Sequence, residues 1–155
     1  MIEDKELKII QQLRANAREK LTQMSRRTGI PVSTIFEKLK IFEQGVIYKH
    51  TCLLDFRELG YDLRLTLLVK TRQETKQEVK QFLESHHQVN TVYRINNGYD
   101  YLAEVLFKNM KGVQGFLDAL DIRGVTSRKE YYVLEELRRE AFLTSQAHQE
   151  LLRPT

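Results

Sequence analysis

The polar side chains whose types and spacing best suit the binding of a partner molecule lie in one short stretch of the first third of the chain. A tight turn, Thr28-Gly29-Ile30-Pro31, separates two segments whose apolar residues recur at helical spacing, a pattern typical of a helix-turn-helix. The helix that follows this turn would place on its outer face the side chains of Ser33, Thr34, Glu37 and Lys38. Hydroxyl, carboxylate and ammonium groups can pair with base edges in the major groove, so this stretch predicts a helix that reads DNA.

Three further cations, Arg26, Arg27 and Lys40, suit contacts to DNA phosphates, which position a protein on the duplex and make its affinity depend on salt. An exposed polar helix face is often only in contact with water, without binding any partner. The distribution of charge along the chain helps to distinguish these two cases. Residues 1–50 hold ten of the 25 Lys and Arg but only six of the 21 Asp and Glu, which places the whole net charge of +4 there. A basic segment beside a neutral remainder indicates a polyanion-binding module attached to another domain.

Residue types that bind metals or catalyse reactions lack the necessary spacing elsewhere in the chain. The four histidines, at positions 50, 86, 87 and 148, form no ligand set. Cys52, the single cysteine, excludes an intramolecular disulfide and a Cys-based zinc site, and we expect it to be a buried small apolar residue. There is no Gly-rich phosphate loop and no catalytic signature, so we expect no catalytic residue, metal or cofactor.

The 155 residues are enough for one domain or two small ones, and a composition of 41% hydrophobic and 30% charged residues argues against a membrane protein. No apolar run approaches the roughly 20 residues that a membrane-spanning helix needs. The N-terminus, Met1-Ile2-Glu3-Asp4-Lys5, lacks the apolar core of a signal peptide. We therefore expect a cytoplasmic protein that does not contact a membrane.

The elements that must position these side chains can be predicted from the apolar pattern. Residues 1–45 predict three short helices, which form a helix-turn-helix domain. Residues 46–61 predict a strand linker, because residues 46–54 are rich in β-branched and aromatic side chains and lack helical period. Residues 136–155 form a helix-prone tail.

Residues 62–135 predict a second domain with the order β-α-β-β-α-β, so the fold class is α+β with a ferredoxin-like domain. Alternation over residues 63–70 indicates a half-buried strand, and further strands are expected at 89–95, 99–107 and 125–134. Helices are expected at 74–85 and 110–120, and Asn96-Asn97-Gly98 is a strong hairpin signal. Because both helices would cover one face of the sheet, the other face needs a cover, most simply a second copy of the sheet.

Asp100 follows the hairpin turn and has two interpretations from sequence. Its carboxylate could bind the amine of a ligand, or it could be a turn residue that hydrogen-bonds to its own backbone. The residues alone do not decide between them.

The combined pattern resembles the Lrp/AsnC family of feast/famine transcription regulators, over about residues 3–136. The resemblance is carried by the order of the segments Asp4-Lys5-Glu6-Leu7-Lys8-Ile9-Ile10, Gly45-Val46-Ile47, Asn97-Gly98-Tyr99-Asp100-Tyr101, Gly124-Val125 and Tyr132-Val133-Leu134-Glu135. It implies a winged-helix-like DNA-binding domain, a strand linker and a regulatory domain whose open sheet faces pack together in a homodimer. Family dimers often assemble further, and an octamer is expected.

The resemblance also implies that a small effector, usually an amino acid, binds between regulatory domains near the hairpin and the last strand. The corresponding residues here are Asn97, Gly98, Asp100, Arg128 and Glu130. The chain departs from the family where Asn97 replaces a glycine. Arg128 and Glu130 stand where relatives often carry threonine.

We therefore predict an oligomeric, sequence-specific transcription regulator that binds double-stranded DNA. A dimer would present its two DNA-reading helices to half-sites about 34 Å apart, or a multiple of that distance. One alternative is an Lrp-like enzyme of haem biosynthesis, of the sirohaem decarboxylase type. Another is a regulatory partner that oligomerises without strong DNA binding.

Overall fold

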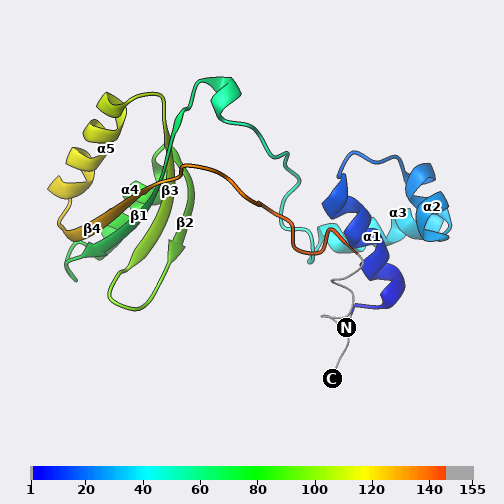
Figure 1. Ribbon diagram of the computed structural model, residues 1–155. Helices are drawn as coiled ribbons and strands as arrows, with labels where there is room; N and C mark the ends of the chain where they lie inside the picture. The colour runs from blue at the N-terminus through cyan, green and yellow to red at the C-terminus, as the bar shows by residue number, and fades with distance from the viewer. Residues whose placement is uncertain (1, 146–155) are drawn as a thin grey trace. The chain divides into compact units, whose positions relative to one another are not determined.

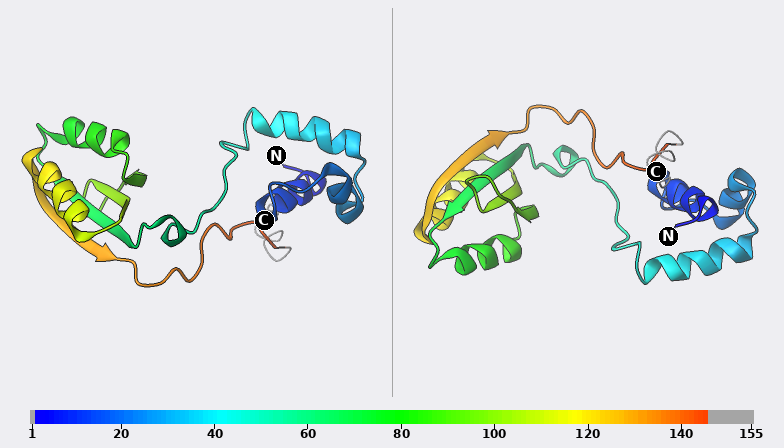
Figure 2. Two further views of the ribbon diagram at one scale, coloured as in Figure 1. Left: turned by 90° about the horizontal axis from the view of Figure 1, so that it is seen from above. Right: turned by 90° about the horizontal axis from the view of Figure 1, so that it is seen from below.

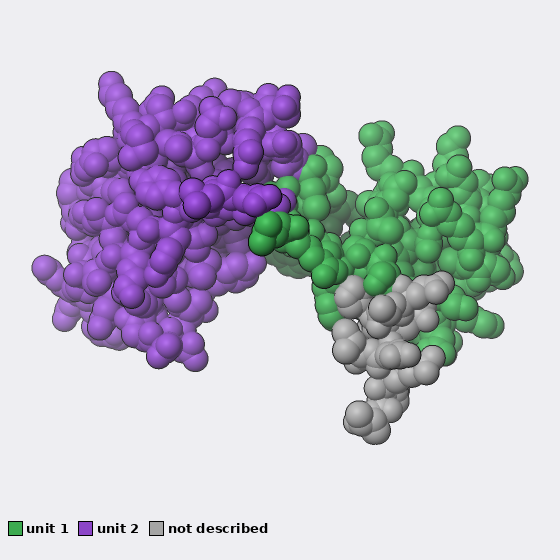
Figure 3. Space-filling view, viewed as in Figure 1, with its two compact units in different colours: residues 1–53, 137–155 green, residues 54–136 purple. Residues whose placement is uncertain are grey.

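The computed structural model describes residues 2–145, which divide into two compact units. Of the described residues, the helical unit contains residues 2–53 and the first part of the tail, residues 137–145, and the sheet unit contains residues 54–136 (Figure 3). The tail therefore groups with the helices, although it follows the last strand in sequence. Each unit has its own apolar core.

The helical unit contains the three predicted helices: α1 (Asp4–Ala15), α2 (Leu21–Thr28) and α3 (Val32–Glu43) (Figure 1). Their inward stripes, together with Ile30 of the turn between α2 and α3, form one core of Ile9, Ile10, Met24, Ile30, Ile35 and Phe42. Gly29 ends α2 with a φ of +72°, a left-handed conformation that glycine adopts without a steric cost. The chain can therefore reverse within a few residues, so that α3 packs against α2 as a helix-turn-helix requires.

The sheet unit has the predicted β-α-β-β-α-β order: β1 (Leu63–Thr71), α4 (Lys76–Ser85), β2 (Val89–Arg94), β3 (Tyr101–Phe107), α5 (Met110–Ile122) and β4 (Val125–Tyr132). The sheet is antiparallel with the strand order β2-β3-β1-β4. Asn97 and Gly98 both have positive φ, 63° and 93°, between β2 and β3. The predicted ferredoxin-like fold and its hairpin turn are confirmed.

Both helices of the sheet unit cover the same face of the sheet (Figure 2). Leu65, Leu67 and Val69 of β1 are fully buried on this face, together with Val79 and Leu83 of α4. Strand periodicity places the alternate residues of β1 and β3 on the opposite face, where Leu68 pairs with Leu102 and Arg64 pairs with Leu106. We call this second surface the open face.

Residues 46–54, predicted as a strand, do not form one. From residue 47 to residue 55 the chain has no regular structure, and a short 3-10 helix, η1 (Arg57–Leu59), follows. The local composition suits a strand, but no strand of the described chain pairs with it. Cys52 belongs to this segment and is exposed, so the expectation that it is buried is wrong.

The described part of the tail, residues 137–145, is not helical, contrary to the helix-prone pattern of its sequence. Its backbone carbonyls at Glu140 and Phe142 accept hydrogen bonds from the Arg14 guanidinium, at 2.9 and 3.1 Å. The amide of Gln11 donates to the carbonyl of Ser145 at 3.2 Å, and Leu143 packs against the helical core. These contacts with α1 replace the local helix, and residues 146–155 lie outside the described part.

Candidate DNA-binding surface and ligand pocket

The outer face of α3 presents the polar side chains that the sequence predicts. Ser33, Thr34 and Glu37 are exposed, while Ile35 and Phe42, 0% and 2% exposed, fix the inner face of the helix in the core. The positions of these exposed groups therefore follow from the buried stripe of the same helix.

Lys38 lies at the side of this face and is held by α1. Its Nζ lies 2.6 Å from Oε1 of Glu6, and the other oxygen of Glu6 accepts a hydrogen bond from the backbone N of Glu3 at 2.9 Å. The hydrogen bond from Lys38 is the main reason that the pKa of Glu6 is lowered, and the same bond raises the pKa of Lys38. The ammonium of Lys38 must leave Glu6 before it can reach a base, so its role as a base reader stays a prediction.

The cations predicted to contact phosphate differ in their surroundings. Arg26 is exposed, and its guanidinium makes no hydrogen bond or ion pair within the described chain. Arg27 pairs with Glu19 at 3.2 Å, but two thirds of its side chain remains exposed. The ammonium of Lys40 lies 4.4 Å from the centre of the Phe36 ring.

Phe36 is 49% exposed on the outer face of α3 and was not among the predicted site residues. The helical periodicity of the sequence already indicates that Phe36 is exposed. Because Ile35, Leu39 and Phe42 form the inward stripe, Phe36 must be rotated about 100° away from that stripe. Ser33, Phe36, Glu37 and Lys40 then share one outward stripe.

Asp100 has a structural environment that matches neither sequence interpretation in full. Its Oδ2 accepts hydrogen bonds from the backbone N of Thr71 at 2.9 Å and from the Thr71 hydroxyl at 3.1 Å. Its Oδ1 accepts a hydrogen bond from the ammonium of Lys76. Burial alone would raise the pKa of Asp100, but these hydrogen bonds outweigh burial and lower it. The carboxylate thus joins the hairpin to β1 and α4, whereas Asn97 and Gly98 form the exposed tip of the turn.

Arg128 and Glu130 of β4 bond to each other, with Nε of Arg128 2.8 Å from Oε1 of Glu130. Arg128 also pairs with Asp121 of α5. Val69 of β1 pairs with Tyr101 on one side and with Arg128 on the other, so the hairpin residues and Arg128 lie at the same end of the sheet. The predicted effector residues therefore form two groups, the hairpin residues Asn97, Gly98 and Asp100 and the β4 residues Arg128 and Glu130. Strand β1 lies between β3 and β4 and separates the two groups.

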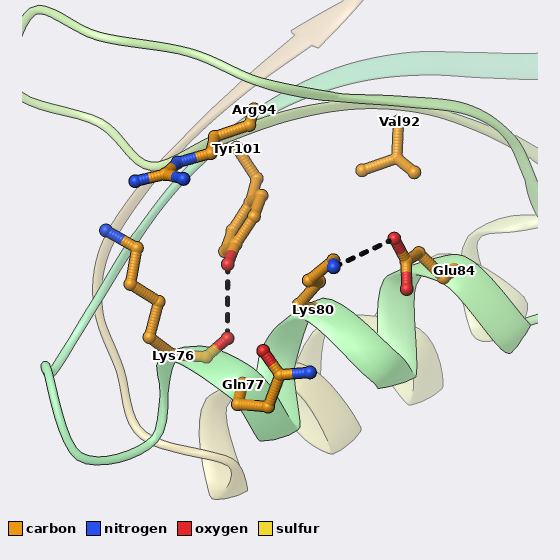
Figure 4. Close-up of a pocket in the computed structure, with 7 residues that line it drawn as sticks. All are labelled: Lys76, Gln77, Lys80, Glu84, Val92, Arg94 and Tyr101. Carbon is orange, nitrogen blue, oxygen red and sulfur yellow. Dashed lines mark hydrogen bonds and ion pairs between the residues drawn. The ribbon is translucent and has the colours of Figure 1, made fainter.

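A cavity of about 240 Å³ lies beside the first of these groups, between α4 and strands β2 and β3. It is lined by Lys76, Gln77, Lys80, Glu84, Val92, Arg94 and Tyr101 (Figure 4). The hydroxyl of Tyr101 donates to the carbonyl of Lys76 at 3.2 Å, and Lys80 pairs with Glu84 at 3.6 Å.

Arg94 lies at the end of the cavity where Lys76 also points, away from Glu84 (Figure 4). The side chain of Arg94 makes no hydrogen bond or ion pair to any described residue, and three of the seven lining side chains are cationic. The cavity therefore suits a small ligand with a negative group. Sequence reasoning missed it because its lining comes from three separate elements.

The described residues hold neither a metal-ligand cluster nor a membrane-spanning helix. Among residues 2–145, no cluster of three or more His, Cys, Asp or Glu side chains is arranged to hold a metal ion. No helix in the same residues is both long enough and apolar enough to cross a membrane.

Residues 65–141 match the model of the Lrp/AsnC ligand binding domain. Over 130 residues the chain is 33% identical to the HTH-type transcriptional regulator FL11 of Pyrococcus horikoshii, covering 83% of this chain and 86% of that protein. It is also 24% identical to the leucine-responsive regulatory protein of Haemophilus influenzae, over 89% of this chain and 87% of that protein.

Solved structures share the fold. A transcriptional regulator of Neisseria meningitidis in complex with L-Met superposes with a TM-score of 0.83 at 22% identity, covering 90% of this chain and 94% of that chain. Escherichia coli AsnC gives a TM-score of 0.79 at 20% identity, covering 90% of this chain and 96% of that chain.

The named sequence relatives are transcriptional regulators and not enzymes, which confirms the prediction of a non-enzymatic protein over the decarboxylase alternative. Together with the helix-turn-helix and the ferredoxin-like sheet unit, these similarities show that the chain belongs to the Lrp/AsnC family of helix-turn-helix transcriptional regulators.

Proposed function

We propose that this regulator acts in the cytoplasm and binds specific DNA sites through the outer face of α3. The observation that carries the proposal is the exposure of Ser33, Thr34 and Glu37 on a helix whose other side is fixed in the core. The guanidinium of Arg26 is available for a phosphate, and Arg27 and Lys40 supply further positive charge beside the same helix. Base contacts give the sequence preference, and phosphate contacts give most of the affinity.

Two variants test this proposal against DNA fragments recovered from a genomic library. Arg26→Ala should weaken binding to every fragment and reduce the slope of log affinity against log salt by about 1.8, the value for one lost phosphate contact in each protomer of the dimer. Glu37→Gln should weaken the preferred fragment relative to unrelated DNA. Unchanged affinity and slope in both variants would remove this assignment of α3. Failure of the wild type to retain DNA would favour the partner that oligomerises without strong DNA binding.

We further propose a homodimer in which two copies pack their open faces together, and an octamer built from such dimers. The open face carries Leu68 and Leu102 at its centre, and Tyr93 and Tyr131 are 59% and 52% exposed. Contiguous exposed apolar side chains mark interaction surfaces. In light-scattering measurements Leu102→Glu should yield monomers, whereas Ile122→Glu, at an 84% exposed position at the end of α5, should not. A Leu102→Glu protein of unchanged mass would contradict this arrangement.

Finally, we propose that the sheet unit binds a small carboxylate effector such as an amino acid. The neighbour from Neisseria meningitidis was solved with L-Met, and the cavity beside Asp100 offers Arg94 to a carboxylate. A panel of amino acids should contain one that raises the melting temperature of the wild type. The same amino acid should leave Arg94→Ala unaffected but still stabilise Lys111→Ala, an exposed cation of α5. An equal shift in both variants would exclude the cavity as the effector site.

A further inference from the structure

The outward side of α3 carries a large aromatic side chain that the core does not use. Phe36 is 49% exposed, although it lies between the polar residues Ser33 and Glu37 on the surface that faces away from the core. An aromatic ring left in water forgoes the free energy of burial, so an exposed phenylalanine at the centre of a binding helix indicates contact with an apolar group of the partner.

The neighbours of Phe36 limit what that contact can be. The ammonium of Lys40 lies 4.4 Å from the ring centre, on one face of the ring. Lys38, the other cation on this part of α3, is bound to Glu6 of α1. The outward stripe therefore offers a hydroxyl, an aromatic ring, a carboxylate and one ammonium in the order Ser33, Phe36, Glu37 and Lys40.

Among the groups that the four base pairs expose in the major groove, the C5-methyl of thymine is the apolar one. We propose that Phe36 is a specificity-determining residue that contacts a thymine methyl in each half-site, while Lys40 beside its ring is directed to the neighbouring phosphate or guanine. The inference rests on the proposed role of α3 in DNA binding. It assigns sequence preference to the ring and not to Lys38.

The thymine methyl can be removed without changing base pairing, and this allows a direct test. Sites preferred by the wild type are first selected from a random DNA library. Each thymine of one selected site is then replaced in turn by deoxyuridine, and binding is measured by fluorescence anisotropy. Each half-site should contain one position at which this single replacement weakens wild-type binding about fourfold, the factor expected for one buried methyl-sized group.

The variants decide whether Phe36 is responsible. Phe36→Ala should bind the thymine and deoxyuridine sites equally, and Phe36→Leu should keep part of the difference. Ile41→Ala, at another exposed apolar position of α3 that is 56% exposed, should retain the full wild-type difference. Because Phe36 is half exposed, circular dichroism is expected to show the same helix content in every variant.

Two results would overturn the inference while leaving site-specific binding by α3 intact. One is a wild type that is indifferent to deoxyuridine at every position, and the other is a Phe36→Ala protein that is as sensitive as the wild type. If the wild type selects no preferred site at all, the proposed function fails as well.

Discussion

Replacement of Asp100 by alanine should destabilise the sheet unit, because the carboxylate connects three elements. It accepts two hydrogen bonds from Thr71 at the end of β1, at 2.9 and 3.1 Å, and it bonds to Lys76 at the start of α4. Asp100 itself follows the hairpin between β2 and β3. The variant would leave the backbone N–H of Thr71, a buried residue, without this acceptor.

The size of the effect follows from these contacts. Leaving a buried donor without an acceptor costs about 1–3 kcal/mol, and a hydrogen bond to a charged group contributes about 1.5–3 kcal/mol. The side chains of Asp100 and Lys76 are 19% and 28% exposed, so solvent screening reduces the ion pair to about 1 kcal/mol. We therefore expect Asp100→Ala to lower the free energy of unfolding by about 3 kcal/mol, and Asp100→Asn, which keeps one acceptor, by about 1.5 kcal/mol.

Thermal unfolding at pH 7 measures this loss. For a domain of this size 1 kcal/mol corresponds to about 4–8 °C, so Asp100→Ala should melt at least about 12 °C below the wild type. A double-mutant cycle with Lys76→Met separates the ion pair from the Thr71 bonds. If Asp100→Ala melted within about 2 °C of the wild type, the carboxylate would not hold these elements together.

Acid should remove the same stabilisation. The hydrogen bonds from Lys76 and Thr71 outweigh the opposing effect of burial and lower the pKa of Asp100 from its ordinary value of 3.8. A carboxyl group with a lowered pKa in the folded state stabilises the fold above its unfolded pKa, and this contribution is lost as the pH falls through the folded value. The difference between wild type and Asp100→Ala should be constant near neutral pH and narrow below about pH 4.

Three further variants test the packing. Gly124→Ala should lose about 2 kcal/mol in urea unfolding, because Gly124 has a φ of +87° and a Cβ there would lie 2.6 Å from Oγ1 of Thr75. Gly115→Ala is the matched control in α5, where nothing lies within 4 Å, and a similar loss there would contradict the steric explanation. Met24→Ala removes a side chain that is 0% exposed and should lower the free energy of unfolding of the helical unit by about 3 kcal/mol, so that the helical circular dichroism is lost at a lower urea concentration. An unchanged transition would mean that the core tolerates the void. Arg14→Ala should release the tail and accelerate trypsin cleavage at Arg138, and equal cleavage rates would show that these hydrogen bonds do not retain it.

The elements that the sequence predicted correctly are those whose signals are local. The three helices follow from apolar residues at helical spacing and from Gly29, and the strands of the sheet unit follow from alternation and from the Asn97-Gly98 turn. Residues 46–54 show the limit of this reasoning. A strand requires a hydrogen-bonding partner, and composition does not reveal whether the fold supplies one.

The site was less predictable because its important contacts join residues far apart in sequence. Lys38 and Glu6 are separated by 32 positions, and Asp100 lies 29 positions from Thr71 and 24 from Lys76. Helical periodicity correctly placed Ser33, Thr34 and Glu37 on the surface, but it could not show that Lys38 is bound to α1.

The carboxylates of the helical unit differ in whether they pair with a cation of the same unit. Glu6 is bound to Lys38 and Glu19 to Arg27, so each of these acids is neutralised within the unit. Glu37 differs, because it is exposed on α3 and bonds to no cation of the described chain. In the proposed complex its charge repels phosphates and is compensated only where a cytosine amino group donates to it. The acidic residue therefore weakens binding to wrong sequences more than to the right one, and the surface that attracts DNA also discriminates among sites.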